Sequence, residues 1–379
     1  MPSMRKPILI LLAILAIGIT GVLGSLIWIN SSSGLNWLQA RINTAIPGNV
    51  TIGGWRLSLF KPGLELNEVI LHGPNGIPVA GLGHLSLTID WRPLLGRVIY
   101  LQDVRLQAPW LELALDESAR LNLMSALTPP GPEPPPADKG NGLPLNIVCR
   151  NFQLNDGRVS FKPADASMVV AAEGIALFAA GDLKDRRARL DADVSRIRYE
   201  RSGIHPPSAS LAVKARLDGD RLQLSKASII AGSTTVDLNG VVDALTTNLN
   251  VDAMLTVKSR LTDLKNSFQA TGDYRGLATA RLNLDGALSN PAAQLELIVD
   301  EARVAGQPLD RFHLSAALED RQIRIEDTAL QLAGGTIRLT GTADLRQAFP
   351  SGFLEPPAAM DAIRYFLELI PDIPDLKPW

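Results

Sequence analysis

Cysteine, aromatic residues and net charge are all scarce in this chain of 379 residues. The single cysteine, Cys149, excludes an intramolecular disulfide and a thiolate cluster for a structural metal. Aromatic residues make up only 5%, whereas 31 glycines and 26 prolines indicate many short strands and turns rather than an aromatic-rich pocket. The 37 lysines and arginines nearly balance the 39 aspartates and glutamates without forming a basic block, so the composition argues against nucleic acid as a partner.

The sequence also lacks the common motifs of catalysis and metal binding. The four histidines, His72, His84, His205 and His313, are too far apart for a zinc helix of the H-E-x-x-H type. Neither a G-x-S-x-G nucleophile turn nor a G-x-x-x-x-G-K phosphate loop occurs. We therefore expect no catalytic residues, no cofactor and no metal site, and a protein that is not an enzyme.

One long apolar run is present near the N-terminus, where residues 8–29 contain no charge. At about 1.5 Å per residue, a helix of this length spans about 33 Å, which matches a bilayer core. Arg5 and Lys6 precede the run, so the positive-inside rule places residues 1–7 in the cytoplasm and the rest of the chain outside. The residues expected to anchor this helix in the membrane include Ile8, Leu15, Val22 and Trp28. A cleaved signal peptide is the alternative, although its apolar core is usually shorter and no A-x-A site follows this run.

Residues 30–128 predict one amphipathic helix followed by short strands. Leu35–Ile46 spaces its apolar residues along one helical face and is followed by Pro47. From Val50 onwards apolar residues alternate with polar ones, which is typical of half-buried strands. Residues 129–144 then contain seven prolines in sixteen positions, and we expect a semi-stiff linker that divides the exported part of the chain in two.

The alternation resumes over residues 145–349, and this region repeats internally. A shift of 101 residues aligns Leu211 with Phe312 and Leu224 with Ile325, and the apolar register holds without a gap over more than thirty positions. Repeating units of this kind stack into a continuous sheet. The candidate residues for its apolar side are Leu211, Val213, Leu217, Leu222, Leu224, Leu282, Leu284, Phe312, Leu314, Leu318, Ile323 and Ile325.

A second helix is expected in the C-terminal segment, residues 350–379. The stretch Met360–Ile370 spaces its apolar residues along one helical side before Pro371. No polar capping element follows it. We therefore expect either that the sequence is a fragment or that a partner covers the last strand edge.

Because each strand has one apolar and one polar side, something must cover the apolar face of the sheet. Closure into a barrel, folding into a sandwich, and an elongated curved sheet whose inner groove holds something apolar all meet this requirement. An outer-membrane barrel is disfavoured, because its strands would expose a lipid-facing band. The alternation does not choose among the three arrangements.

The order of these segments resembles that of the AsmA and TamB superfamily. The anchor, the helix LNWLQARINTAI, VTIGGWRLSLF-x-PGLELNEVIL and LLGRVIYLQDVRLQAPWLELALDESARLNL look like its opening module. LDGALSNPAAQLELIVDEARVAGQPL, followed by LQLAGGTIRLTGTADL, resembles the G-x-L-x-x-P repeats of TamB-like proteins. The resemblance implies a mainly β fold in which an N-terminal transmembrane helix precedes an elongated, curved, taco-like antiparallel β-sheet groove with one or two short amphipathic helices. It also implies a single-pass inner-membrane protein whose bulk lies in the periplasm of a double-membraned bacterium.

In that superfamily the groove is thought to carry phospholipid between the inner and outer membranes, so the resemblance implies phospholipid transport or outer-membrane lipid homeostasis. The twelve apolar residues named above, from Leu211 to Ile325, are then the candidate lining of the lipid groove. The implied partners are membrane phospholipids, the inner membrane, and an outer-membrane or periplasmic protein at the distal end. A second use of the same sheet is assembly of outer-membrane proteins by β-strand addition to its edge. A purely structural envelope protein with a closed sandwich core is the third alternative. The chain departs from the larger members in its length and its proline-rich insertion.

Overall fold

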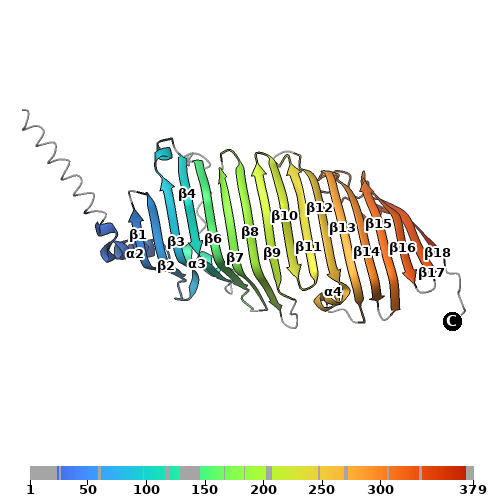
Figure 1. Cartoon of the computed structure of the whole chain (residues 1–379), viewed down its shortest axis with the longest axis horizontal. Coiled ribbons are helices and arrows are strands. Elements are labelled where there is room, and N and C mark those ends of the chain that lie inside the picture. The colour runs from blue at the N-terminus through green and yellow to red at the C-terminus, as the bar shows by residue number, and fades with distance from the viewer. Residues whose placement is uncertain are drawn as a thin grey trace, which may run out of the picture. The chain divides into compact units, whose positions relative to one another are not determined.

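The structure is a computed structural model, shown in Figure 1. It describes Gly24 and residues 27–58, 61–96, 98–115, 120–128, 146–165, 167–182, 184–201, 207–245, 248–268, 272–304, 307–332 and 335–372. These residues contain eighteen strands and few helices, so the expectation of a mainly β protein is confirmed. The chain divides into two compact units, Met1–Ser167 (unit 1) and Met168–Trp379 (unit 2).

The membrane anchor expected at residues 8–29 falls almost entirely outside the described part of the chain, and so do Ile8, Leu15 and Val22. Trp28 is described, is half exposed, and lies with its ring centroid 6.2 Å from that of Trp37. Among the described residues, no helix is long and apolar enough to cross a membrane.

Unit 1 is a sheet with two helices. Its elements are α2 (Ser32–Ala45), β1 (Asn49–Ser58), β2 (Gly63–His72), β3 (Pro78–Asp90), the 3-10 turn η1 (Arg92–Gly96), β4 (Val98–Gln107), β5 (Trp110–Ala114), α3 (Asn122–Leu127) and β6 (Asn146–Lys162). Helix α2 confirms the amphipathic helix expected at Leu35–Ile46. The small core of this unit includes Ile52, Val79, Val104 and Ala126, with the last residue contributed by α3.

Strand β6 departs from the expected all-antiparallel sheet. Strands β1 to β4 pair antiparallel in chain order, but β6 runs parallel to β4 and to β5. A parallel neighbour requires a long crossover connection, and the proline-rich residues 129–144 lie within that connection. The chain after these residues therefore returns to unit 1, which extends to Ser167. Sequence alternation gives no sign of the direction of a strand, so the parallel pairing of β6 is not predictable from it.

The outer edge of β1 is covered by amide side chains from α2 and from Asn30, which lies two residues before the helix. Asn43 accepts a hydrogen bond from the backbone N–H of Val50 at 2.7 Å and donates to its carbonyl at 3.1 Å. Asn30 pairs in the same way with Leu57, at 2.6 and 3.0 Å, and Gln39 donates to the carbonyl of Ile52 at 3.3 Å. These amides take the place of a neighbouring strand, so the edge has few free backbone groups left.

Unit 2 is an antiparallel meander. Its elements are β7 (Met168–Asp182), β8 (Arg187–Arg201), β9 (Ala209–Asp218), β10 (Arg221–Ala231), β11 (Thr234–Asp243), β12 (Asn250–Arg260), α4 (Leu261–Phe268), β13 (Arg275–Ala287), β14 (Ala292–Val304), β15 (Gln307–Glu319), β16 (Gln322–Leu332), β17 (Gly335–Asp344), the 3-10 turn η2 (Met360–Ala362) and β18 (Arg364–Asp372). Each strand pairs with the next one in the chain, as Figure 1 shows for the green to red strands. Helix α4 lies at the end of β12 and contacts β12 and β13.

The internal repeat has a structural counterpart. The 101-residue shift superposes β9, β10 and β11 on β15, β16 and β17. A β-bulge interrupts β10 between Leu224 and Ala227, and a bulge at the equivalent place interrupts β16 between Ile325 and Thr328. The repeat therefore preserves an irregularity of the backbone as well as the apolar register.

The prediction of a helix at Met360–Ile370 is wrong. Residues Met360–Ala362 form only the 3-10 turn η2, and Arg364–Asp372 form strand β18, which pairs with β17 over nine residues. The connection before it packs against other turns of unit 2, since Arg321 donates to the carbonyls of Phe349 and Pro350 at 2.8 and 2.7 Å. That connection returns the chain to the edge of β17, where pairing overrides the apparent helical spacing.

Candidate functional site

The strongest candidate for a functional surface is one side of the sheet in unit 2. Paired residues of antiparallel strands share a side, so the register can be followed from β7 to β18. One row of facing residues crosses all twelve strands and consists of Leu177, Ala192, Val213, Ala227, Leu238, Leu255, Leu282, Leu295, Ala316, Ile325, Gly341 and Leu367. We call this row the central row, and the side of the sheet that contains it the apolar face.

The rows on either side of the central row are equally free of charge. One runs from Ala179 to Tyr365 and the other from Ile175 to Leu369, and across the described strands of unit 2 neither row contains a charged side chain. At about 4.8 Å between strands and about 7 Å between rows, the three rows cover a footprint of about 50 by 20 Å, or about 1,000 Å². The largest apolar patch on an ordinary monomer is about 300–600 Å².

All twelve residues that the sequence assigned to the apolar side lie on this face. Val213, Leu282 and Ile325 belong to the central row. The other nine occupy neighbouring rows on the same side: Leu211, Leu217, Leu222, Leu224, Leu284, Phe312, Leu314, Leu318 and Ile323. The structure therefore brings the candidate residues onto one surface.

Within the described residues, no second layer closes over the apolar face to form a sandwich core. In its three rows only Gly341 and Thr328 are buried, and every other residue is half-buried or exposed. Leu190 and Ile229 are 36% and 43% exposed. Side chains in the core of a sandwich would be almost completely buried. The face is therefore open along the described strands of unit 2.

Two glycines on this face, Gly240 and Gly341, leave no room for a Cβ atom beside the neighbouring strand. A Cβ atom on Gly240 would lie 2.6 Å from the carbonyl oxygen of Asp252 and 2.7 Å from Cα of Ala253. A Cβ atom on Gly341 would overlap the carbonyl oxygen of Phe366. Gly240 pairs with Leu224 and Gly341 pairs with Ile325, so each glycine faces the residue at which a bulge begins.

The opposite side of the sheet, which we call the charged face, carries ion pairs between neighbouring strands. Lys214 lies 3.3 Å from Asp191, Arg281 lies 3.4 Å from Glu296, and the Arg311 to Asp300 distance is 3.5 Å. These pairs are solvent-exposed and contribute little to stability one by one. Because these charged side chains all lie on one side of the sheet, that side is well hydrated and the apolar face carries none of them.

The few shifted pKa values have local causes outside the apolar face. Arg346 donates hydrogen bonds to both carboxylate oxygens of Asp344, at 2.9 and 2.6 Å, and holds the pKa of that carboxyl well below its ordinary value. The hydroxyl of Ser233 donates to Asp263 and lowers its pKa. In unit 1, burial raises the pKa of the Cys149 thiol, which disfavours a reactive thiolate.

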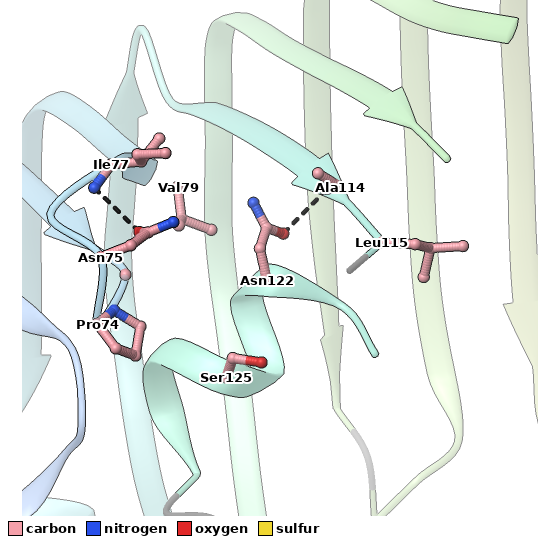
Figure 2. A pocket seen from close by; sticks show the side chains of 9 residues that line it. Pro74, Asn75, Ile77, Val79, Ala114, Leu115, Asn122 and Ser125 are labelled. Atoms are coloured by element: carbon pink, nitrogen blue, oxygen red, sulfur yellow. Dashed lines mark hydrogen bonds between the residues drawn. The ribbon is translucent and has the colours of Figure 1, made fainter. Parts of the chain in front are cut away.

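Unit 1 contains a separate cavity of about 410 Å³, shown in Figure 2. It lies between the turn that joins β2 to β3, the end of β5 and helix α3. Its two amides hold the surrounding loops. Asn75 accepts from the N–H of Ile77 at 3.1 Å, and Asn122 accepts from the N–H of Ala114 at 3.0 Å. Ile77 and Val79 contribute to its apolar wall.

Within the described part of the chain, no group of three or more His, Cys, Asp and Glu residues is arranged to hold a metal ion. Comparison with models of protein families, with curated proteins and with solved structures finds no match for this chain.

Sequence reasoning missed two features that bear on function. The edge of β1 is covered by Gln39 and Asn43 of α2 and by Asn30, and amides at these positions in the sequence are compatible with many other roles. Strand β18 resembles a helix in sequence because apolar residues occupy both of its sides. The run Tyr365–Ile370 contains five large apolar side chains in six positions, and that density was the available signal for a strand.

Proposed function

We propose that this protein is a membrane-anchored, non-enzymatic carrier of phospholipid in the periplasm, similar to AsmA and TamB proteins, and that it acts between the inner and outer membranes. The observation that supports the proposal most is the apolar face of unit 2, whose three rows cross twelve strands without a charge. In this proposal residues 8–29 anchor the chain in the inner membrane, and the apolar face lines a curved groove.

The energy of exposing an acyl chain explains why a carrier needs a continuous face. Burial of one methylene is worth about 0.8 kcal/mol, so about fifteen methylenes drawn through water would cost about 12 kcal/mol. A gap in the path, even of a few strands, would expose part of the chain. The central row offers an aliphatic residue or glycine at every strand, so a chain sliding across the sheet keeps its contacts.

The composition of the face favours movement over tight binding. The central row consists of Leu, Ala, Val, Ile and Gly, and successive strands offer similar contacts. A tight site would instead surround its ligand and fix it with a few placed polar groups. The half-exposed side chains of the apolar face leave one side of a bound chain open, which suits exchange with a membrane.

Site-specific photo-crosslinking tests the proposal. A photoreactive residue at Leu282 or Leu284 lies on the apolar face, whereas one at Asn283 lies on the charged face of the same strand, β13. After irradiation of cells that express the full chain, we expect phospholipid adducts at positions 282 and 284, detected by mass spectrometry of the purified protein. Absence of acyl adducts at both positions, or equal labelling at position 283, would refute the proposal.

Assembly of outer-membrane proteins by strand addition is a second candidate, which the exposed strand β18 favours. Depletion of the protein separates the two functions. Altered phospholipid content of the outer membrane with normally folded barrel proteins supports lipid transport. Unfolded barrel proteins with normal lipid content support assembly instead.

A further inference from the structure

Strand β18 has properties that the other strands of unit 2 do not share. All nine of its residues are exposed, and its large side chains include Tyr365 at 74%, Phe366 at 66% and Leu369 at 62% exposure. It pairs with β17 through one edge, and no strand in the described residues pairs with its other edge. In unit 1, by contrast, amide side chains cover the outer edge of β1.

Apolar residues occupy both sides of β18. Tyr365, Leu367 and Leu369 pair with Ala343, Gly341 and Leu339 and extend the apolar face. Phe366 and Ile370 lie on the opposite side, where they pair with Thr342 and Arg338 of the charged face. An isolated edge strand gains nothing from apolar residues on a side that is otherwise charged.

The sequence of β18 is complementary to itself about Glu368. An antiparallel pairing of two copies with Glu368 at the centre places Leu367 opposite Leu369, Phe366 opposite Ile370 and Tyr365 opposite Pro371. At the two ends it places Arg364 opposite Asp372, which are oppositely charged. The two apolar residues on the charged face thereby acquire cross-strand partners.

We propose that β18 pairs antiparallel with β18 of a second copy of this chain, about a two-fold axis at Glu368 that is perpendicular to the sheet. Such an axis keeps both apolar faces on the same side, so the face continues from one copy into the other. The proposal depends on the shape and sequence of β18 alone and stands without the proposed lipid function.

The interface is small, so the pairing is weak and reversible. Nine residues at about 3.3 Å and two layers of side chains roughly 15 Å thick give about 450 Å² per copy and about 900 Å² in total, within the range of transient contacts. Pro371 lacks a backbone donor, but it lies next to the end of the strand, where the loss to the pairing is least.

Two Glu368 carboxylates meet at the axis and repel each other. Arg338 pairs with Ile370 and is therefore a diagonal neighbour of Glu368 on the charged face. One Arg338 from each copy offsets part of the repulsion. We therefore expect Glu368→Gln to raise the dimer fraction severalfold, and Phe366→Lys to abolish the dimer, because a lysine there would face Ile370 of the other copy.

Disulfide crosslinking of the full chain in its membrane tests the register. In a Cys149→Ala background, a single Glu368→Cys substitution brings two cysteines together at the axis, within the Cα separation of about 4.4–6.8 Å that a disulfide needs. We expect a disulfide-linked dimer after mild oxidation. Thr340→Cys is the matched control, because it lies on the same side of β17 but about 14 Å from its copy.

A second pair of variants controls for adventitious oxidation and for loss of folding. Phe366→Cys and Ile370→Cys should each remain mostly monomeric alone and crosslink when the two variants are co-expressed. Failure of Glu368→Cys to dimerise while Glu368→Gln retains the native circular dichroism spectrum would overturn the proposal. Crosslinking of Glu368→Cys to a different protein would also overturn it and would assign the edge to another partner, such as a strand of an outer-membrane protein.

Discussion

A charge placed anywhere in the central row should block lipid passage to a similar extent. Leu238, Leu282 and Ile325 lie in the central row on β11, β13 and β16. An arginine at a lipid-facing position of a membrane barrel costs about 2–4 kcal/mol. With about 1.36 kcal/mol per tenfold change in rate, each single substitution should slow transfer by about 30- to 1,000-fold.

In the proposed function, lipid crosses the strands of the central row one after another. Two equal barriers in series add their resistances, so Leu238→Arg combined with Leu282→Arg should be only about twofold slower than either variant alone. Asn283→Arg, on the charged face of β13, is the matched control and should transfer lipid normally.

The assay is a pulse-chase of labelled phospholipid from the inner to the outer membrane in cells that depend on the variant. Melting curves check that each variant folds. Normal transfer by Leu282→Arg would refute the path. If the double variant slows transfer by the product of the two single slowdowns, the two positions do not act as separate barriers in series.

Three other predictions concern stability. Gly240→Ala should destabilise unit 2 by about 1–3 kcal/mol, because the new Cβ would lie 2.6 Å from the carbonyl oxygen of Asp252. Gly54→Ala is the control and should be nearly neutral, since the atom nearest to its Cβ would be 3.7 Å away. Thermal melting compares the two variants. Asn43→Ala should cost about 1–3 kcal/mol and speed hydrogen exchange at Val50, while Asn36→Ala, at an exposed position of the same helix, should do neither. The lowered pKa of Asp344 implies stabilisation that is fully present above the ordinary carboxyl pKa of about 4 and is lost as the pH falls below it. Arg346→Ala should return the pKa of Asp344 toward that value, which an NMR titration of the carboxyl measures; an unchanged titration would contradict the assigned hydrogen bonds.

The class of fold and the composition of the apolar face could be predicted because both follow from local alternation. A residue and its second neighbour share a side of a strand, so Leu282 and Leu284 had to lie together wherever β13 paired. The 101-residue repeat then placed Leu211 and Phe312 on the same side, which the register confirms.

The direction of β6 and the identity of β18 depend on contacts that are distant in the sequence. Cys149 pairs with Leu101 in a parallel register, and nothing near Cys149 encodes that choice. Phe366 and Leu367 fit a helical face as well as they fit a strand, and the edge of β17 decides between the two. Whether the apolar face was open also required the structure, because exposure depends on what packs above a strand.

The amides along β1 also limit how large an assembly can become. Sheets that expose two complementary edges can add copies without end and form fibres. Asn30, Gln39 and Asn43 already occupy backbone groups along the outer edge of β1, so this strand of unit 1 offers few groups to a second copy. Addition of further chains at β1 is therefore disfavoured, which protects this strand against polymerisation through its edge.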